Sequence, residues 1–330
     1  MLQRRPVLFG GFAGALLAPT LRAAEPLDPA EALQRALKST VSVQVRAVDG
    51  AGSTTTLGRD RQGSGIVIDE QGHVLTIGYL VLEADAVDLQ THDGRRFPAR
   101  VLAYDVATGF GLLQPLVPTG LAPVKLGEPQ ALGAETPLLV TSGGPDGGWS
   151  PARLLARRAF AGYWEYHIEG ALFTTPPRRD HSGAGLFNLG GELLGVGSLI
   201  LADAGGAPGN MFVPVDLLRP ILAELLTMGR SRASSRAWLG LNCVEQAGAV
   251  RVARVTADSP AALGGVRPGD QILRIDGTAV QELGALWKQL WAGATPEREV
   301  TLDVQRDGQA RRLVLRSVDR ASTLRKPTGV

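Results

Sequence analysis

A single serine is the residue in this chain best placed to do chemistry. Ser182 lies in the run Asp-His-Ser-Gly-Ala-Gly at residues 180–185, where the glycines favour a tight turn, and two apolar strand-like runs follow it. A serine hydroxyl is a poor nucleophile unless a base removes its proton and a third group orients that base. The question is therefore whether the chain supplies both.

The chain has four histidines that could act as the base. His73 lies on a predicted strand and His92 in a predicted turn, whereas His167 ends an aromatic segment typical of an edge or loop. His181 adjoins Ser182, and neighbouring side chains in an extended or tightly turned segment diverge. Solvated or hydrogen-bonded histidines account for all four, and no pair has the spacing of a metal site. The sequence predicts neither a metal nor a cofactor.

The composition is that of a globular protein with room for two domains. The chain has 330 residues, 44% hydrophobic and 20% charged. Paired arginines at positions 4 and 5 precede an apolar run at residues 7–17 and a small-residue segment at 21–24. That order is typical of an export signal, and the run is too short to span a bilayer. We predict a signal peptide at residues 1–23, export to the periplasm by the general secretory or the twin-arginine route, and no stable membrane span after cleavage.

Cleavage of the signal would change the charge of the protein. Three arginines and no acidic residues would be lost, which takes the net charge from +2 to −1. Binding of nucleic acid requires clustered excess positive charge, so nucleic acid is excluded as a partner. The single cysteine, Cys243, cannot form an intrachain disulfide, and its apolar surroundings in the sequence predict a small buried residue.

Short apolar runs broken by turn residues dominate the chain from about residue 40 to about residue 215. Runs rich in Val, Ile and Leu, such as 65–68 and 87–90, are separated by Gly, Pro, Asp and Asn. Many short strands at this spacing indicate an all-β barrel or sandwich. Residues 31–37 and 215–226 instead have helical spacing, and Gly229 ends the second of these helices.

A second, smaller unit follows a polar segment. Residues 230–236 lack periodicity and are predicted to link a first domain at 24–229 to a second at 237–317. The predicted elements of the second domain are strands at 250–255, 271–275 and 300–305 and helices at 259–262 and 283–291. This mixture of strands and helices is of domain size. The polar tail at residues 318–330 is expected to be frayed.

These motifs together resemble the HtrA family, exported serine proteases in which a trypsin-like double β-barrel is followed by a PDZ domain. The resemblance covers roughly residues 40–317. The matching pieces are Gly-Ser-Gly-Ile-Val-Ile at 63–68, Gly-His-Val-Leu-Thr at 72–76, His-Ser-Gly at 181–183, Asn-Met-Phe-Val-Pro-Val-Asp at 210–216, Ser-Pro-Ala-Ala at 259–262 and Val-Arg-Pro-Gly-Asp at 266–270. The resemblance implies a mainly β fold, a double barrel followed by a smaller α/β PDZ domain, and assembly into homo-oligomers.

The resemblance also places three unusual residues around Ser182. Where the family has Thr-Asn-Asn-His-Val-Val, this chain has Thr-Ile-Gly-Tyr-Leu-Val, so Tyr79 takes the position of the general base. The family's Thr-Asp-Leu-Ala-Val-Leu becomes Thr-Gly-Phe-Gly-Leu-Leu, so Gly109 takes the position of the orienting aspartate. Asp180 replaces the glycine that helps to form the oxyanion hole.

Each of these replacements opposes catalysis. A tyrosine with an ordinary pKa of about 10 is protonated at neutral pH, and Gly109 has no side chain to orient a base. Asp180 does not readily adopt the positive φ that glycine allows, and its carboxylate would repel a developing oxyanion. Losing triad members that act as a unit costs on the order of 10⁶-fold in rate.

We therefore expect an inactive protease homologue in which Tyr79 fills the volume of the lost imidazole and hydrogen-bonds Ser182. Ser182 itself would then be a turn residue that hydrogen-bonds its surroundings. The alternative is an active serine endopeptidase in which a non-standard base serves Ser182.

The second domain keeps the binding features of the family it resembles. A PDZ domain takes an extended peptide as an added strand and holds its C-terminal carboxylate with backbone N–H groups. The residues that match the carboxylate-binding loop are Trp238, Leu239, Gly240 and Leu241. Leu286 and Leu290, four residues apart on a predicted helix, either line the side-chain pocket or pack in the core. The resemblance implies binding of polypeptide C-termini or unfolded segments, as an adaptor or chaperone-like protein of the cell envelope.

Overall fold

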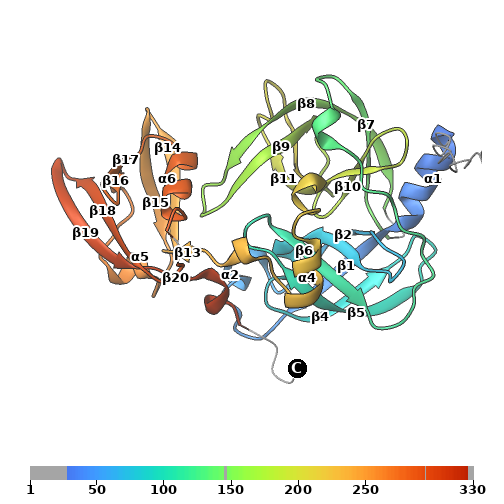
Figure 1. Ribbon diagram of the computed structural model, residues 1–330, viewed down its shortest axis with the longest axis horizontal. Coiled ribbons are helices and arrows are strands. Elements are labelled where there is room, and N and C mark those ends of the chain that lie inside the picture. Colours follow the sequence, from blue (N-terminus) through green and yellow to red (C-terminus); the bar gives the residue numbers. More distant parts are fainter. Residues whose placement is uncertain (1–27, 145–146, 294, 326–330) are drawn as a thin grey trace, which may run out of the picture.

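The computed structural model describes residues 28–144, 147–293 and 295–325. The predicted signal peptide lies outside these residues. Two closed β-barrels form one end of the molecule and a smaller unit with its own sheet forms the other (Figure 1). This arrangement confirms the expected mainly β fold. Within the described residues, no helix is long and apolar enough to cross a membrane.

The first barrel closes in the strand order β1-β2-β3-β6-β5-β4. Its strands are β1 (Thr40–Ala47), β2 (Asp60–Val67), β3 (Val74–Ile77), β4 (Ala84–Gln90), β5 (Arg96–Tyr104) and β6 (Phe110–Pro115). Helix α1 (Pro29–Ser39) precedes the barrel, α2 (Thr54–Leu57) lies between β1 and β2, and the single turn α3 (Gly78–Val81) follows β3. Val41, Val43 and Val45 alternate along β1 and are all buried, which is the pattern that predicted a strand here.

The second barrel closes in the order β10-β11-β12-β9-β8-β7. Its strands are β7 (Pro137–Thr141), β8 (Trp149–Ala161), β9 (His167–Thr175), β10 (Gly185–Phe187), β11 (Leu193–Leu201) and β12 (Gly209–Pro214), preceded by η1 (Pro129–Ala131). One cluster of buried side chains runs through both barrels, from Ile66 and Phe110 in the first to Phe173 and Phe187 in the second. This common core fixes the position of one barrel against the other.

The helix predicted at 215–226 is wrong in one respect, because two short helices take its place. They are η2 (Val215–Leu217) and α4 (Leu222–Met228). Pro220 separates them, since proline lacks an N–H and disfavours the helical conformation of the residue before it. The apolar stripe still packs against the barrels, with Leu218 and Leu225 fully buried. Gly229 ends α4 in the left-handed conformation, as expected.

The C-terminal unit has its own core around a sheet in the order β14-β15-β16-β18-β19. Its strands are β13 (Ala237–Trp238), β14 (Leu241–Gln246), β15 (Ala249–Val255), β16 (Gln271–Ile275), β17 (Thr278–Ala279), β18 (Glu299–Arg306), β19 (Gln309–Arg316) and β20 (Val318–Asp319), and its helices are α5 (Pro260–Leu263) and α6 (Leu283–Leu290). Cys243 is buried, as predicted, and belongs to the same core as Trp287.

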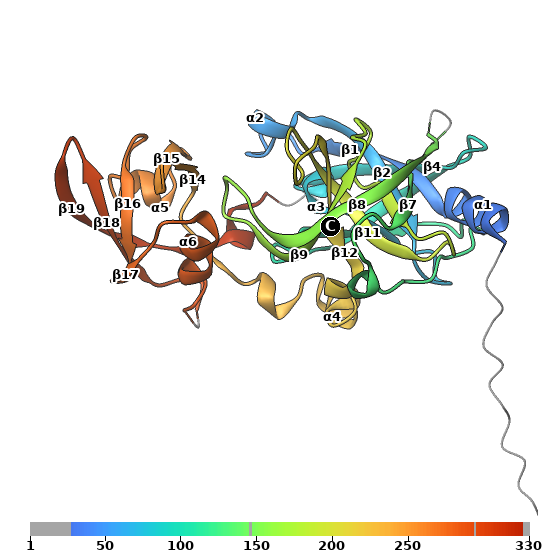
Figure 2. The same ribbon diagram turned by 90° about the horizontal axis from the view of Figure 1, so that it is seen from above.

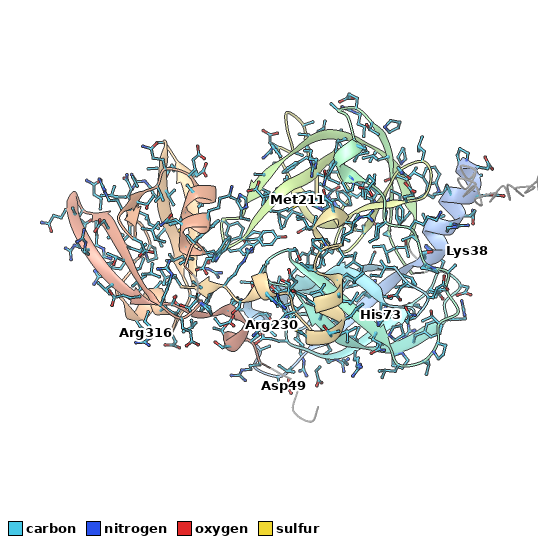
Figure 3. The ribbon with its side chains drawn as sticks, in the orientation of Figure 1. Lys38, Asp49, His73, Met211, Arg230 and Arg316 are labelled. Atoms are coloured by element: carbon cyan, nitrogen blue, oxygen red, sulfur yellow. The ribbon has the colours of Figure 1, made fainter. Side chains whose placement is uncertain are left out.

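The segment between the barrels and the C-terminal unit is packed rather than exposed throughout. It contains η3 (Arg232–Ser234), and Ser231 and Ser234 are buried. Both of these serine hydroxyls donate to the carboxylate of Asp105, at 2.5 and 2.8 Å. Arg230, labelled in Figure 3 between the barrels and the C-terminal unit, forms an ion pair with Asp319.

The expected fraying of the tail is wrong for residues 318–325. Strand β20 pairs with β13, and η4 (Arg320–Thr323) follows it. The guanidinium of Arg320 stacks on Trp238, and Arg325 N donates to Glu83 Oε1 at 2.8 Å. The tail therefore contacts both the first barrel and the C-terminal unit, which the sequence pattern alone did not indicate.

Candidate functional site

The predicted turn at Ser182 is present and connects the two barrels. Ser64 N in β2 donates to Ser182 O at 2.8 Å, and Gly183 N donates to Gly197 O in β11 at 2.8 Å. Gly183 has φ +72°, and a Cβ atom there would lie 2.0 Å from Ser64 O. Only glycine fits this position, so the local sequence and both barrels together fix the serine.

Tyr79 in α3 contacts Ser182 directly, so the expected hydrogen bond is present. The phenol oxygen lies 2.7 Å from Ser182 Oγ and 2.9 Å from the backbone oxygen of Ser198. A carbonyl oxygen can only accept, and the phenol carries a single proton. Tyr79 is the donor in both contacts, so its single proton is shared between Ser182 Oγ and Ser198 O.

This arrangement leaves the proton of Ser182 in place. Burial raises the pKa of Tyr79 to about 12, against the opposite effect of its hydrogen bond with Ser182. The phenol therefore stays neutral at physiological pH, and a neutral phenol is a very weak base. Tyr79 can position the serine hydroxyl, but it cannot activate it.

The space beside Gly109 is filled by another tyrosine. Gly109 has φ +78°, and a Cβ atom there would lie 2.7 Å from Tyr166 Oη and 3.2 Å from its ring. Tyr166 is buried, and its hydroxyl donates to Thr108 O at 2.8 Å. An aspartate side chain at position 109 would therefore overlap this ring. Sequence reasoning missed Tyr166, whose partner Thr108 is 58 residues away along the chain.

The loop predicted to hold a peptide carboxylate binds a carboxylate of the same chain. Glu165, which lies between β8 and β9, accepts the N–H groups of Leu239, Gly240 and Leu241 on Oε1 at 3.1, 2.8 and 2.9 Å. Gly240 has φ +84°, and a Cβ atom there would lie 2.4 Å from Ser259 Cβ, so the loop requires glycine. Glu165 was not among the predicted site residues.

The other residues predicted for peptide binding lie around this loop. Trp238 is half-buried under the guanidinium of Arg320. Leu286 and Leu290 are fully buried in the core of the C-terminal unit. Of the two alternatives for these leucines, core packing is the one that their burial favours.

Comparison with known proteins identifies both parts of the chain. A trypsin-like peptidase domain model matches residues 63–196, and a PDZ domain model matches residues 237–316. The periplasmic serine endoprotease DegP of Escherichia coli is 29% identical over 263 residues, which cover 75% of this chain and 55% of DegP. A probable periplasmic DegP-like endoprotease of Pseudomonas fluorescens is 30% identical over 279 residues, with 77% and 55% covered.

The chain belongs to the HtrA family. It spans about half the length of these curated relatives. Solved structures of HtrA proteins share its fold, among them the HtrA-type protease AlgW with decapeptide, at 22% identity and a TM-score of 0.55 over 91% of this chain and 100% of that one. The serine endoprotease from Yersinia pestis matches at 20% identity and a TM-score of 0.55, over 89% and 98% of the two chains.

Asp180 of this HtrA protein is ionised and bound to its neighbours. Its carboxylate accepts from Arg178 Nε at 2.9 Å and from Ser142 Oγ at 2.5 Å. Burial tends to raise the pKa of Asp180, but these hydrogen bonds outweigh it and hold the pKa below its ordinary value. The φ angle of Asp180 is not positive, so this residue does not have the left-handed conformation that glycine allows. The carboxylate also forms an ion pair with the guanidinium of Arg178, which compensates its charge.

None of the four histidines of this HtrA protein is hydrogen-bonded to Ser182 in the described residues. His181 Nδ1 lies 3.1 Å from Arg178 O, and His73, labelled in Figure 3, places Nδ1 2.7 Å from Asp69 Oδ2. His92 and His167 lie outside hydrogen-bonding reach of Ser182. In the part of the chain that the structure describes, no hydrogen bond joins a histidine to Ser182, and no cluster of three or more His, Cys, Asp or Glu could hold a metal ion.

Proposed function

We propose that this protein is an exported, periplasmic HtrA-family member that does not cleave peptide bonds. Its function is to bind polypeptide C-termini or extended segments through the PDZ domain, as an adaptor or chaperone-like protein. The observation that carries the first part is the hydrogen bond between Ser182 Oγ and the phenol of Tyr79, whose pKa is raised to about 12. A serine held by a neutral phenol has no general base.

The surroundings of Gly109 support the same conclusion. A substitute base would need an acid or a carbonyl to orient it, and the position that the family uses for this acid is closed by the buried ring of Tyr166. Asp180 stands at the position of the oxyanion-hole glycine, and its φ is not positive, so the backbone there does not have the conformation that glycine allows.

The geometry of the PDZ domain supports the binding function. Three successive N–H groups, from Leu239 to Leu241, converge on one carboxylate oxygen of Glu165. A loop of this geometry also fits the terminal carboxylate of a peptide. Relatives named as periplasmic proteases and a neighbour solved with a decapeptide agree with the proposed location and ligand class.

A fluorophosphonate probe, which esterifies activated serines, tests the loss of catalysis. We expect the wild-type protein to remain unlabelled, like its Ser182→Ala variant, at every pH from about 6 to about 9, because Tyr79 stays neutral throughout that range. An unfolded protein substrate should also remain intact after prolonged incubation.

Trypsin in the same reaction is the positive control for the probe. Labelling of the wild type that disappears in Ser182→Ala, together with cleavage of the unfolded substrate, would instead establish the active endopeptidase. That result would require a base that serves Ser182 in place of Tyr79.

A further inference from the structure

Residues 162–165 lie as an extra strand along the edge of the PDZ sheet. Strand β14 is the last in the sheet order and has a free edge on the side away from β15. On that edge Cys243 N donates to Tyr163 O at 2.6 Å, and Trp164 pairs with Asn242 in an antiparallel bridge. The segment between β8 and β9 therefore adds to the sheet in the direction that a PDZ ligand takes.

Helix α6 forms the other wall around this segment. The indole of Trp287 donates Nε1–H to Gly162 O at 2.9 Å, and Ala161 packs against the core of the PDZ domain. Lys288 on the same helix forms an ion pair with Glu169 of β9 at 2.6 Å. Figure 2 shows β8 and β9 extending from their barrel toward α6 and β14. The segment thus occupies the groove between the strand and the helix.

The segment ends with a carboxylate at the position of a ligand terminus. Going along the chain, Tyr163 pairs beside Cys243, Trp164 beside Asn242, and Glu165 reaches the N–H groups that follow Trp238. A bound peptide would present its last three residues in the same order. The side chain of Glu165 therefore stands where the terminal carboxylate of a peptide would stand.

We propose that residues 162–165 are an internal ligand of the PDZ groove and that Glu165 competes with the free C-terminal carboxylate of a polypeptide. This inference rests on the proposed binding function and adds what occupies the site and what must be displaced. A tethered ligand faces the groove at a high effective concentration. An external peptide accordingly binds with an apparent affinity reduced by the fraction of molecules in which the groove is open.

Removal of the Glu165 carboxylate tests this competition. The probe is a fluorescent peptide that copies residues 159–164, followed by a valine with a free carboxylate. We expect the Glu165→Ala variant of the mature protein to bind it about tenfold or more tightly than the wild type does, since the competitor loses its anchor. The same peptide with a C-terminal amide should bind both proteins more weakly than the free acid does, because the amide offers the loop one acceptor oxygen in place of two.

Amide hydrogen exchange measures the contact between Glu165 and the loop N–H groups without any added peptide. We expect the N–H groups of residues 239–241 to exchange about tenfold or more faster in Glu165→Ala than in the wild type. Glu165→Gln, which keeps the shape and one acceptor oxygen, should lie between the two. Asp60→Ala is the matched control, since Asp60 is an exposed carboxylate of the first barrel that makes no contact with the PDZ domain among the described residues.

Peptide affinity and amide hydrogen exchange together distinguish a failure of the internal ligand from a failure of the proposed peptide-binding function. Unchanged exchange in Glu165→Ala, or equal peptide affinity of wild type and variant, would overturn the internal ligand. Faster exchange with no peptide binding to either protein would leave Glu165 as the occupant of the loop and would reject the peptide-binding function.

The internal contact should also weaken as the pH rises. Burial raises the pKa of Glu165 from its ordinary 4.5 to about 7, with the loop N–H groups and the cation of Arg320 acting in the opposite direction. Cys243 faces Glu165 as a neutral thiol, because burial raises its pKa. A pKa raised by docking means that the contact is fully favoured when Glu165 is protonated and loses stability as the pH rises through 7.

We therefore expect exchange at residues 239–241 to accelerate more in the wild type than in Glu165→Gln between about pH 5 and about pH 7. The Gln variant is the reference because both proteins share the intrinsic effect of pH on exchange. Parallel pH profiles for the two proteins would contradict the expected loss.

Discussion

Replacing Gly109 by aspartate, the change that would restore the missing acid, should destabilise the protein by about 3 kcal/mol or more instead of activating it. The backbone there has φ +78°, which L residues rarely adopt, and a Cβ atom would lie 2.7 Å from the buried Tyr166 hydroxyl. The ring cannot move aside freely, because its hydroxyl donates to Thr108 O and Trp164 stacks on its face. Urea-induced unfolding of the variant and the wild type measures the difference.

A matched pair of alanine substitutions separates backbone strain from overlap. Gly120 has φ +67°, and no atom lies within 4 Å of a Cβ built there. We expect Gly120→Ala to cost about 1 kcal/mol from strain alone, whereas Gly109→Ala costs about 2 to 4 kcal/mol. Equal costs at the two positions would show that the ring of Tyr166 does not close the site. Tyr166→Phe, which removes the nearest atom, should lower the cost of Gly109→Ala.

The same overlap bears on attempts to restore catalysis. Tyr79→His supplies an imidazole opposite Ser182, but the histidine would still lack an orienting acid. We therefore expect the double variant Tyr79→His, Gly109→Asp to remain unlabelled by the fluorophosphonate probe.

Removing the carboxylate of Asp105 should cost about 4 kcal/mol, the largest loss of stability expected from a single polar side chain. Asp105 is fully buried and accepts five hydrogen bonds, from the N–H and hydroxyl of Ser231, the hydroxyl of Ser234, and the N–H and hydroxyl of Thr108. In Asp105→Ala these donors lose their acceptor inside the protein. The loop that ends at Gly109 would also lose its carboxylate contacts with the segment leading to the PDZ domain and would keep the hydrogen bond from Val106 N to Ser234 Oγ.

Two comparisons sharpen this prediction. Asp60→Ala removes an exposed carboxylate whose side chain is 78% accessible, so it should change stability little. Asp105→Asn keeps one acceptor oxygen but turns an NH₂ group toward donors, so its cost should be intermediate. A loss below about 1 kcal/mol in Asp105→Ala would mean that water satisfies the stranded donors.

The contribution of Asp105 to stability should also depend on pH. Burial tends to raise the pKa of Asp105, but the hydrogen bonds from the serines and Thr108 outweigh it and lower the pKa. A lowered pKa means that this contribution is present above the ordinary pKa of the group and is lost as the pH falls through the lowered value. The difference in stability between wild type and Asp105→Ala should therefore shrink in strong acid.

Local patterns in the sequence were sufficient to predict a mainly β first domain and a smaller mixed second domain. Apolar alternation and turn residues are properties of neighbouring positions, and they predicted several strands of each domain. The double barrel, the PDZ domain and the position of Tyr79 opposite Ser182 followed from the resemblance to the HtrA family. The helix over 215–226 was wrong because its apolar spacing was weighed without the proline at position 220.

The contacts that the sequence did not indicate are all between distant segments. The partners of Tyr166, Glu165 and Asp105 lie 58, 75 and 126 residues away. No periodicity or composition marks such a contact, because it exists only after the barrels and the PDZ domain have formed around it. The packed tail after Ser317 escaped prediction for the same reason.

Glu165 and Tyr166 are consecutive residues, yet one fills the carboxylate loop of the PDZ domain and the other fills the space beside Gly109. An acidic side chain at position 109 would have to displace the ring of Tyr166, and with it the preceding residue. The two sites are therefore mechanically coupled: a substitution beside Ser182 should also loosen the contact that Glu165 makes with the N–H groups of residues 239–241.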